Sequence, residues 1–354
     1  MNFTNENFLF IGTYTQSLPH VDGKAAGIYS CQFDENGRLA IKQYTSDIEN
    51  PSYLALSADK KYLYAAQEGG TVEDSGIFAY AVDHHTGLLT LLNRQPAHGV
   101  APCYLCTDKT GKYLLTANYG TGNVVVYSLQ EDGRIAEPTA VVQHHGRGLN
   151  DVRQEAPHAH MVLPTMDNQY VLVADLGTDS IVVYRFYPEM GQLERFSVAS
   201  VEPGAGPRHM ALHGNGRILF VLNELNSTLT TFRFVDGQLT PLQTLSTLPN
   251  GFSGDSYCAA IRVGGNGRFV YASNRGHDSV ATFAFDEVNE LLTLVDHSDT
   301  QGKTPRDFIL LDDLMLVGNQ DSGTVAHYKI DSATGVPQPT GQISHIPTPV
   351  CFQY

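Results

Sequence analysis

Apolar and polar positions follow a pattern that repeats along this chain. Each copy opens with Pro or Ser, continues into a short apolar strand and a polar turn, and reaches a second strand that ends in a small residue or Asn. A turn of Gly, Ser, Thr and Asp leads to a third strand ending in Tyr or Phe, and a polar hairpin leads to a fourth. The copies start at Pro51, Pro102, Pro157, Pro207, Ser256 and Pro305, so successive starts lie 49 to 55 residues apart. Four short strands at this period are typical of a β-propeller.

The two ends of the chain have the patterns of the two parts of one further copy. The stretch NFLFIGTYTQ, from Asn7, is typical of a second strand, and the terminal PTPVCFQY is typical of the opening of a unit. We therefore expect residues 349–354 to pair with residues 8–13, which completes a seventh blade and removes exposed sheet edges. The sequence predicts an all-β fold, a seven-bladed β-propeller closed by its N- and C-terminal strands, with residues 1–354 in a single domain.

The composition of the chain limits the binding partners and the cellular compartment that are expected. The 354 residues include 22 Lys and Arg against 37 Asp and Glu, a net charge of −15. Such an acidic chain argues against nucleic acid or a membrane as a partner, because both bind positive surfaces. The N-terminus lacks the segments of a signal peptide, no apolar run reaches the length of a membrane span, and the five cysteines are scattered. These features predict a cytoplasmic protein.

Two of the cysteines, Cys103 and Cys106, form a C-x-x-C pair with no second Cys or His pair at zinc spacing. On a regular strand, residues three apart face opposite sides. We therefore interpret both as small buried residues. No metal and no other cofactor is predicted for the chain.

Comparison of the copies singles out residues that packing does not require. The first strand of a propeller blade lines the central channel, and the plain copies place Ser52 and Cys103 at its start. Three other copies carry His or Arg there: His158 and His160, Arg208 and His209, and Arg306. Because Ser and Cys serve in the same slot, these charged and titratable residues indicate a function.

The end of the second strand shows a similar contrast. Five copies place Asn or Asp there, at Asn118, Asp175, Asn223, Asn274 and Asn319, which we interpret as turn or cap residues. The following residue varies, and Glu224 and Arg275 depart most from a packing role. In an antiparallel pair, the start of one strand lies beside the end of the next. We therefore expect all these unusual residues to meet at one mouth of the channel.

Arginines gathered at one cavity of an acidic protein indicate an anionic ligand, because guanidinium binds carboxylate or phosphate in a bidentate geometry. His and Glu beside them are candidates for proton transfer near neutral pH. The polar segment 141–160 is interpreted as a functional loop, and it contributes Arg153 as a further candidate for ligand binding. The alternative to such a ligand-binding site is that these residues are scattered, solvent-exposed charges at the mouth of the channel.

The chain resembles the lactonase family of seven-bladed propellers in five motifs that span nearly its whole length. They are FIGTYT from Phe10, NPSYLALSADKKYLYA from Asn50, HHGRGLNDVRQEAPHAHMVLP from His144, GAGPRHMALHGNGRILFVLNEL from Gly204 and VYASNRGHDSVATF from Val270. The family includes cycloisomerase-type 6-phosphogluconolactonases and carboxymuconate lactonizing enzymes. By motif, the resemblance implies a catalytic set of His160, Arg208, Glu224 and Arg275, with His158 as the alternative to His160.

The activity that this resemblance implies is metal-independent hydrolysis of 6-phosphoglucono-δ-lactone to 6-phosphogluconate. Arginines would hold the phosphate and the oxyanion, and Glu224 or His160 would take the proton from water. His158, His209, Arg306 and Arg153 are expected to bind the substrate, a small anionic sugar lactone. Two alternatives remain: an enzyme that forms or opens another lactone, of a muconate-type or sugar acid, and a non-catalytic propeller that binds a sugar acid or a protein.

Overall fold

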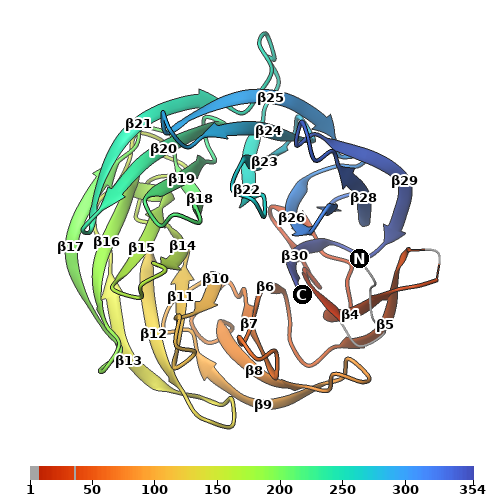
Figure 1. The fold of residues 1–354 in the computed structure, drawn as a ribbon. Coiled ribbons are helices and arrows are strands. Elements are labelled where there is room, and N and C mark those ends of the chain that lie inside the picture. Colours follow the sequence, from red (N-terminus) through yellow and green to blue (C-terminus); the bar gives the residue numbers. More distant parts are fainter. Residues whose placement is uncertain (1–7, 36) are drawn as a thin grey trace.

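Seven antiparallel four-stranded sheets stand around a central axis like the blades of a propeller (Figure 1). The structure is a computed structural model that describes residues 8–35 and 37–354. In six blades, the chain runs from the innermost strand to the outermost, and the seventh blade combines both ends of the chain. The prediction of an all-β seven-bladed propeller is confirmed.

The blades are numbered here from the composite one. Blade 1 contains β30 (Pro349–Gln353), β1 (Leu9–Thr13), β4 (Ile28–Phe33) and β5 (Leu39–Thr45), and a hairpin of β2 (Ser17–Leu18) and β3 (Val21–Asp22) projects from it. Blade 2 contains β6 (Pro51–Leu56), β7 (Tyr62–Gln67), β8 (Gly76–Val82) and β9 (Leu89–Pro96). Blade 3 contains β10 (Pro102–Thr107), β11 (Tyr113–Asn118), β12 (Asn123–Leu129) and β13 (Ile135–Gln143). Blade 4 contains β14 (Ala159–Pro164), β15 (Tyr170–Asp175), β16 (Ser180–Tyr187) and β17 (Gln192–Ser200).

The remaining blades follow the same plan. Blade 5 contains β18 (Pro207–Leu212), β19 (Ile218–Asn223), β20 (Thr228–Val235) and β21 (Gln238–Ser246). Blade 6 contains β22 (Tyr257–Val263), β23 (Phe269–Arg275), β24 (Ser279–Asp286) and β25 (Leu291–Asp299). Blade 7 contains β26 (Pro305–Leu311), β27 (Leu314–Asn319), β28 (Thr324–Ile330) and β29 (Pro337–His345). Within the described residues, the one helical element is the short 3-10 helix η1 (Leu176–Thr178), and none could span a bilayer.

The ends of the chain close the ring through β30 and β1. These strands are antiparallel, with Phe10 opposite Gln353 and Gly12 opposite Cys351. The predicted pairing of residues 349–354 with 8–13 is confirmed within one residue at each end. Closure gives β1 a partner on both sides, because β4 pairs with its other edge.

Apolar clusters fill the spaces between neighbouring blades. One cluster joins Leu115 of blade 3 to Val173 of blade 4, and another joins Leu172 of blade 4 to Val221 of blade 5. Similar clusters join blades 5 and 6, blades 6 and 7, and blades 7 and 1, and a larger one spans blades 1, 2 and 3. Each blade therefore buries both of its faces against its neighbours.

A bulge near the start of the innermost strand sets the register that matters for function. In blade 5, Pro207 lies opposite Asn223 and His209 lies opposite Leu222, which leaves Arg208 without a cross-strand partner. A bulge of this kind re-aims the unpaired side chain. The residues in this bulge position are Ser52, Cys103, His160, Arg208 and Arg306 in blades 2, 3, 4, 5 and 7.

This register corrects the sequence comparison, which aligned His158 with Arg208 on the basis of the opening Pro. Ala159 lies opposite Asp175, so Ala159 occupies the place of Pro207 and His160 occupies that of Arg208. The alignment by Pro was wrong in blade 4 because the chain enters β14 two residues later than the pattern indicated.

The same bulge explains why Cys103 and Cys106 do not face opposite sides as expected. Cys103 Sγ lies 3.5 Å from the carbonyl oxygen of His160, and Cys106 Sγ lies 3.3 Å from that of Val162. Both side chains therefore contact β14. The extra residue of the bulge changes the alternation between the two cysteines.

The recurring Asn at the end of the second strand ties blades together. Asn118, Asn274 and Asn319 are fully buried, and each side-chain amide donates to a backbone carbonyl of the preceding segment, at 3.0, 2.9 and 2.7 Å respectively. The interpretation as turn or cap residues holds for Asp175, which caps η1. The backbone acceptors of the three asparagines instead lie 19 to 27 positions earlier in the chain. The residues that directly follow second strands, such as Tyr14, Glu68 and Glu224, lie beside the starts of the first strands at one end of the axis. We call this end of the axis the inner rim.

Candidate active site

The inner rim holds a buried carboxylate surrounded by three guanidinium groups. Glu224 directly follows β19, and its side chain is almost completely buried. Its Oε2 atom lies 2.9 Å from Arg208 Nε and 3.1 Å from a terminal nitrogen of Arg275. Its Oε1 atom accepts a 2.7 Å hydrogen bond from Arg153. The structure thus brings together four residues that lie up to 122 positions apart, from Arg153 to Arg275.

Backbone carbonyls of β22 hold two of these arginines in place. Arg208 donates through a terminal nitrogen to the carbonyl of Ala259, and Arg275 donates to that of Cys258 at 2.9 Å. The Nε atom of Arg275 is buried and makes no hydrogen bond within the described part of the chain. The cluster therefore keeps donor capacity that a ligand could use.

Arg153 reaches Glu224 because a compact loop holds it there. The neighbouring Gln154 is fully buried, and its side-chain amide donates to Asp179 Oδ1 at 2.7 Å and to a carbonyl of η1 at 2.8 Å. The side chain of Asn150 accepts a 3.0 Å hydrogen bond from the Arg153 amide. The segment interpreted as a functional loop is thus anchored by buried polar contacts that position one charged side chain.

Crowded charges shift the ionisation of this cluster. Burial disfavours the carboxylate of Glu224, but Arg275, Arg208 and Arg153 outweigh burial and lower its pKa far below 4.5. Burial and the neighbouring Arg275 lower the pKa of Arg208 to about 10. Arg208 therefore stays protonated at neutral pH, in surroundings that oppose its charge. An anionic ligand would relieve this opposition.

His160 lies beside this cluster in the bulge position of blade 4. Its ring meets the rings of Tyr119 and His209 edge-on, at centroid distances of 5.6 and 5.4 Å. Its Nδ1 atom lies 3.7 Å from Cys103 Sγ, and none of the hydrogen bonds among the described residues involves Nε2. Burial, reinforced by Arg208, lowers the pKa of His160 well below 6.5. The imidazole is therefore neutral at neutral pH and can accept a proton.

His158 has different surroundings. Its Nδ1 atom lies 2.8 Å from the carbonyl oxygen of Tyr119, and its Nε2 atom lies 3.3 Å from a carboxylate oxygen of Glu155. Its ring also stacks on that of Tyr119, with centroids 4.4 Å apart. Both nitrogens are thus occupied, and His158 supports Tyr119, which contacts His160 and Arg153.

His209 lies deeper than His160. Its ring contacts the edges of Tyr53 and Tyr104 as well as His160, and burial lowers its pKa well below 6.5. Neither ring nitrogen has a hydrogen-bond partner within residues 8–35 and 37–354. Because buried polar atoms are normally satisfied, water or a ligand is the partner to expect here.

Three further residues complete the rim on the side of blades 1, 2 and 7. Arg306 donates a 2.8 Å hydrogen bond to the hydroxyl of Tyr14, and that hydroxyl donates a 2.7 Å hydrogen bond to Glu68. Sequence comparison selected Arg306 but missed Tyr14 and Glu68. Both directly follow a second strand, as Glu224 does. This shared register was the available signal, and the composite blade concealed it for Tyr14.

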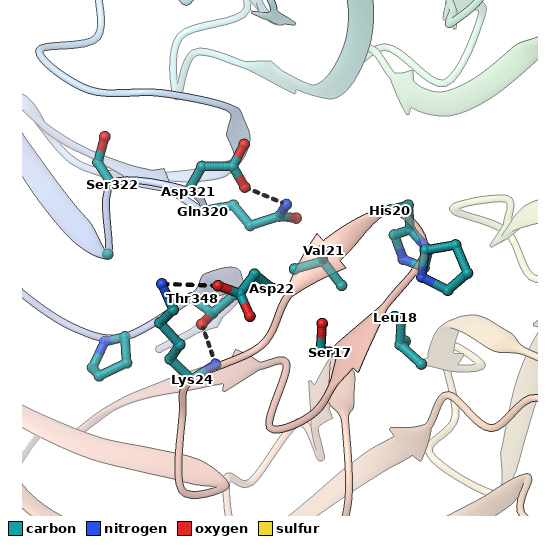
Figure 2. Close-up of a pocket in the computed structure, with 13 residues that line it drawn as sticks. Ser17, Leu18, His20, Val21, Asp22, Lys24, Gln320, Asp321, Ser322 and Thr348 are labelled. Carbon is teal, nitrogen blue, oxygen red and sulfur yellow. Dashed lines mark hydrogen bonds and ion pairs between the residues drawn. The ribbon is translucent and has the colours of Figure 1, made fainter.

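A pocket with a volume of about 700 Å³ adjoins this side of the rim. Figure 2 shows His20 on the β2–β3 hairpin and Gln320 and Asp321 of blade 7 on opposite sides of Val21, with Asp22 and Lys24 below Gln320. His20 and Gln320 also touch the rim, because they lie 3.4 Å from the Tyr14 hydroxyl and 3.2 Å from Arg306 respectively. The pocket therefore adjoins the rim through two of the residues that line it.

The described residues contain no group of three or more His, Cys, Asp or Glu side chains arranged to hold a metal ion. The positive charge at the inner rim comes instead from arginine side chains. Guanidinium groups in a buried site can bind anions and stabilise negative charge that develops during a reaction.

The chain is similar to known proteins over nearly its whole length. Residues 8–354 match the model of the lactonase family of seven-bladed β-propellers. The chain is 33% identical to a 6-phosphogluconolactonase of Bacillus subtilis strain 168, over 98% of this chain and 97% of the relative. It is 30% identical to a 6-phosphogluconolactonase of Formosa agariphila, over 92% and 93%. The structure of a periplasmic gluconolactonase from Pseudomonas aeruginosa superposes with a TM-score of 0.90, at 29% identity, over 98% of each chain.

Proposed function

Because this chain belongs to the lactonase family of seven-bladed β-propellers, we propose that it hydrolyses 6-phosphoglucono-δ-lactone to 6-phosphogluconate. One observation carries the proposal: Glu224 and three arginines form a buried cluster beside the neutral imidazole of His160. Such a cluster combines anion binding with a proton acceptor, and lactone hydrolysis needs both. The names of the relatives support the phosphorylated sugar lactone as the substrate.

The arginines have the electrostatic role. When water attacks the lactone carbonyl, negative charge develops on the carbonyl oxygen. Arg208 and Arg275, which are fixed by backbone carbonyls, stabilise this oxyanion with donors that need no reorganisation. Arg153 is the most exposed of the three arginines around Glu224, with 37% of its side chain accessible, and it is suited to the phosphate.

His160 is the better candidate for the general base. Both carboxylate oxygens of Glu224 are engaged by arginines, whereas Nε2 of His160 makes no hydrogen bond with the described residues. Its role is then to orient the guanidinium groups. The neutral ring of His160 takes the proton from the attacking water at Nε2, while Nδ1 faces Cys103. The imidazolium then returns this proton to the ring oxygen of the lactone as the carbon–oxygen bond breaks, and the products are one carboxylic acid and one hydroxyl group.

A coupled assay on the purified protein tests the proposal. 6-Phosphoglucono-δ-lactone is generated in solution, and the 6-phosphogluconate formed is oxidised and recorded. Heat-inactivated protein measures the spontaneous ring opening, which is subtracted. We expect a clear excess rate that saturates with substrate. Equal rates with active and heat-inactivated protein would exclude this function, and turnover of a muconate-type lactone alone would favour the lactonizing alternative.

We also infer a cytoplasmic location, for which the five unpaired cysteines give support. The structurally similar gluconolactonase of Pseudomonas aeruginosa is periplasmic, which makes the location worth testing. Cell fractionation tests the inference. Recovery with periplasmic markers would contradict it.

A further inference from the structure

A second polar cluster faces the catalytic candidates across the central axis. Glu68 follows β7, Tyr14 follows β1 and Arg306 lies at the start of β26. Figure 1 shows β26, β30 and β6 on the side of the axis opposite β14 and β18, which carry His160 and Arg208. Neither the proposed mechanism nor the family assignment uses Glu68 or Tyr14.

Tyr14 and Arg306 hold the carboxylate of Glu68 in one orientation. The Tyr14 hydroxyl donates to Glu68 Oε2 at 2.7 Å, and Arg306 donates to the same hydroxyl at 2.8 Å. The guanidinium also lies over the Tyr14 ring, 5.1 Å from its centroid. Burial raises the pKa of Tyr14 well above 10, so its hydroxyl stays protonated and can donate. These contacts fix Glu68 without occupying both of its oxygen atoms.

Among the described residues, no hydrogen bond reaches the second oxygen of Glu68. His20 Nε2 lies 3.8 Å from this Oε1 atom, which is beyond hydrogen-bond distance. Burial and Arg306 lower the pKa of His20, so this ring is neutral at neutral pH. Glu68 itself is 9% exposed. The Glu68 side chain is 11% exposed, so water or a ligand can reach the second oxygen and donate a hydrogen bond to it.

Glu68 also shares a cavity with the reaction site. Glu68, Arg306, Arg208 and His209 line a small space of about 10 Å³, which is close to the size of one water molecule. Ser52 lines it as well, and the Ser52 hydroxyl and both His209 nitrogens have no partner in the described part of the chain. The cavity wall therefore presents donors and acceptors together, as a hydroxyl-bearing ligand requires.

This side carries less positive charge than the Glu224 cluster, because Glu68 has the single guanidinium of Arg306 nearby whereas three guanidinium groups surround Glu224. Glu68 would repel an anionic group, and the adjoining pocket carries Asp22 and Asp321, with Lys24 already paired to Asp22 at 2.9 Å (Figure 2). The three arginines around Glu224 give that cluster a net positive charge, although one of them, Arg208, also lines the small cavity beside Glu68. The balance of charge therefore favours an anionic group at the Glu224 cluster and neutral donors at Glu68.

We propose that Glu68, positioned by Tyr14 and Arg306, binds hydroxyl groups of the substrate while the arginines bind its anionic groups. A carboxylate can accept hydrogen bonds from two adjacent hydroxyls, and Arg306 can donate to a hydroxyl oxygen. This inference rests on the proposed function and narrows the substrate class to polyhydroxy lactones. A muconate-type acid has carboxylates and no hydroxyl groups, and would leave Glu68 unpaired.

The test compares Glu68→Gln and Tyr14→Phe with the wild type and with Glu131→Gln, which changes an exposed glutamate in a hairpin of blade 3. Lactone kinetics give KM and kcat, and calorimetry gives the affinity for two product-like probes, 6-phosphogluconate and the hydroxyl-free dicarboxylate cis,cis-muconate. Loss of a hydrogen bond to a charged group should raise KM for the lactone about ten- to a hundredfold in Glu68→Gln, with a smaller change in kcat. Tyr14→Phe should raise it by several-fold, and Glu131→Gln should not change it.

Each outcome decides between the alternatives. Weaker binding of 6-phosphogluconate with unchanged or tighter binding of muconate supports a hydroxyl site. An unchanged KM in both variants, or equal weakening of both probes, overturns it while leaving the lactonase proposal intact. An inactive wild type removes the proposed function, and the two binding measurements still show whether Glu68 selects a hydroxyl-bearing acid. If Glu68→Gln loses its folded structure, as judged by circular dichroism, Tyr14→Phe carries the comparison.

Discussion

At the scale of single residues, the arginine cluster makes the first prediction. Arg208→Ala and Arg275→Ala each remove a charged donor that is proposed to stabilise the oxyanion of the transition state. We expect each variant to lose about ten- to a hundredfold in kcat/KM, mainly through a lower kcat. Arg217→Ala, at an exposed position in a turn of blade 5, is the control. Wild-type kinetics in either cluster variant would show that the guanidinium groups do not act on the substrate.

Substitutions of His160 and Glu224 should impair the enzyme in different ways. His160→Asn removes the proposed base and should lower kcat by about a hundred- to ten-thousandfold with little change in KM. Glu224→Gln leaves three arginines without their carboxylate, so it should raise KM and lower the melting temperature as well. Steady-state kinetics and thermal unfolding separate the two patterns. If Glu224→Gln instead loses only kcat while His160→Asn is active, the base is Glu224.

The pH profile provides an independent check of the base. The pKa of His160 is lowered by burial and by Arg208, so the free enzyme keeps a neutral imidazole as the pH falls below 6.5. The acid limb of kcat/KM should therefore lie well below pH 6.5. The free energy of unfolding should change with pH in the same direction. A histidine whose pKa is lower in the folded state contributes to stability above its unfolded-state pKa of about 6.5, and this contribution is lost as the pH falls. An acid limb at or above pH 6.5 would rule out His160 as the base.

At the scale of elements, closure depends on β30. This strand pairs with β1, and its Cys351 also lies 3.3 Å from the Leu54 amide of blade 2. Deletion of residues 349–354 would expose an edge of β1 and uncover the apolar contacts of Phe352. We expect the truncated chain to aggregate, as measured by light scattering and gel filtration. Removal of Tyr354 alone, which lies outside β30, is the control, and a monodisperse truncated chain would contradict this account.

At the scale of the whole molecule, we expect one cooperative unit. The larger apolar clusters lie between neighbouring blades, so each blade loses a stabilising surface when its neighbour unfolds. Calorimetry should then show a single unfolding transition whose van't Hoff and calorimetric enthalpies agree, as a single domain requires. Two resolved transitions would show that groups of blades unfold separately.

The repeat made the architecture predictable from sequence. Four-strand periodicity and the partial copies at the two ends of the sequence predicted seven blades and their closure. Arg208, Glu224 and Arg275 were also found, because the copies share one register and each departs from what packing needs. These are local properties, in which side-chain alternation and turn residues reflect the strand pattern directly.

The pairing register of the strands and the contacts between distant segments were determined only by the tertiary structure. The bulge that places His160, and not His158, in the slot of Arg208 depends on pairing with β15, and a pattern of single residues does not record a pairing register. Arg153 reaches Glu224 only because the buried Gln154 folds its loop against η1 and Asp179. Tyr14 and Glu68 are recognised as part of the site only through the hydrogen bond from Arg306 to Tyr14, two residues that are 292 positions apart in the chain. Contacts between distant segments are set by the closed ring, and no local pattern contains them.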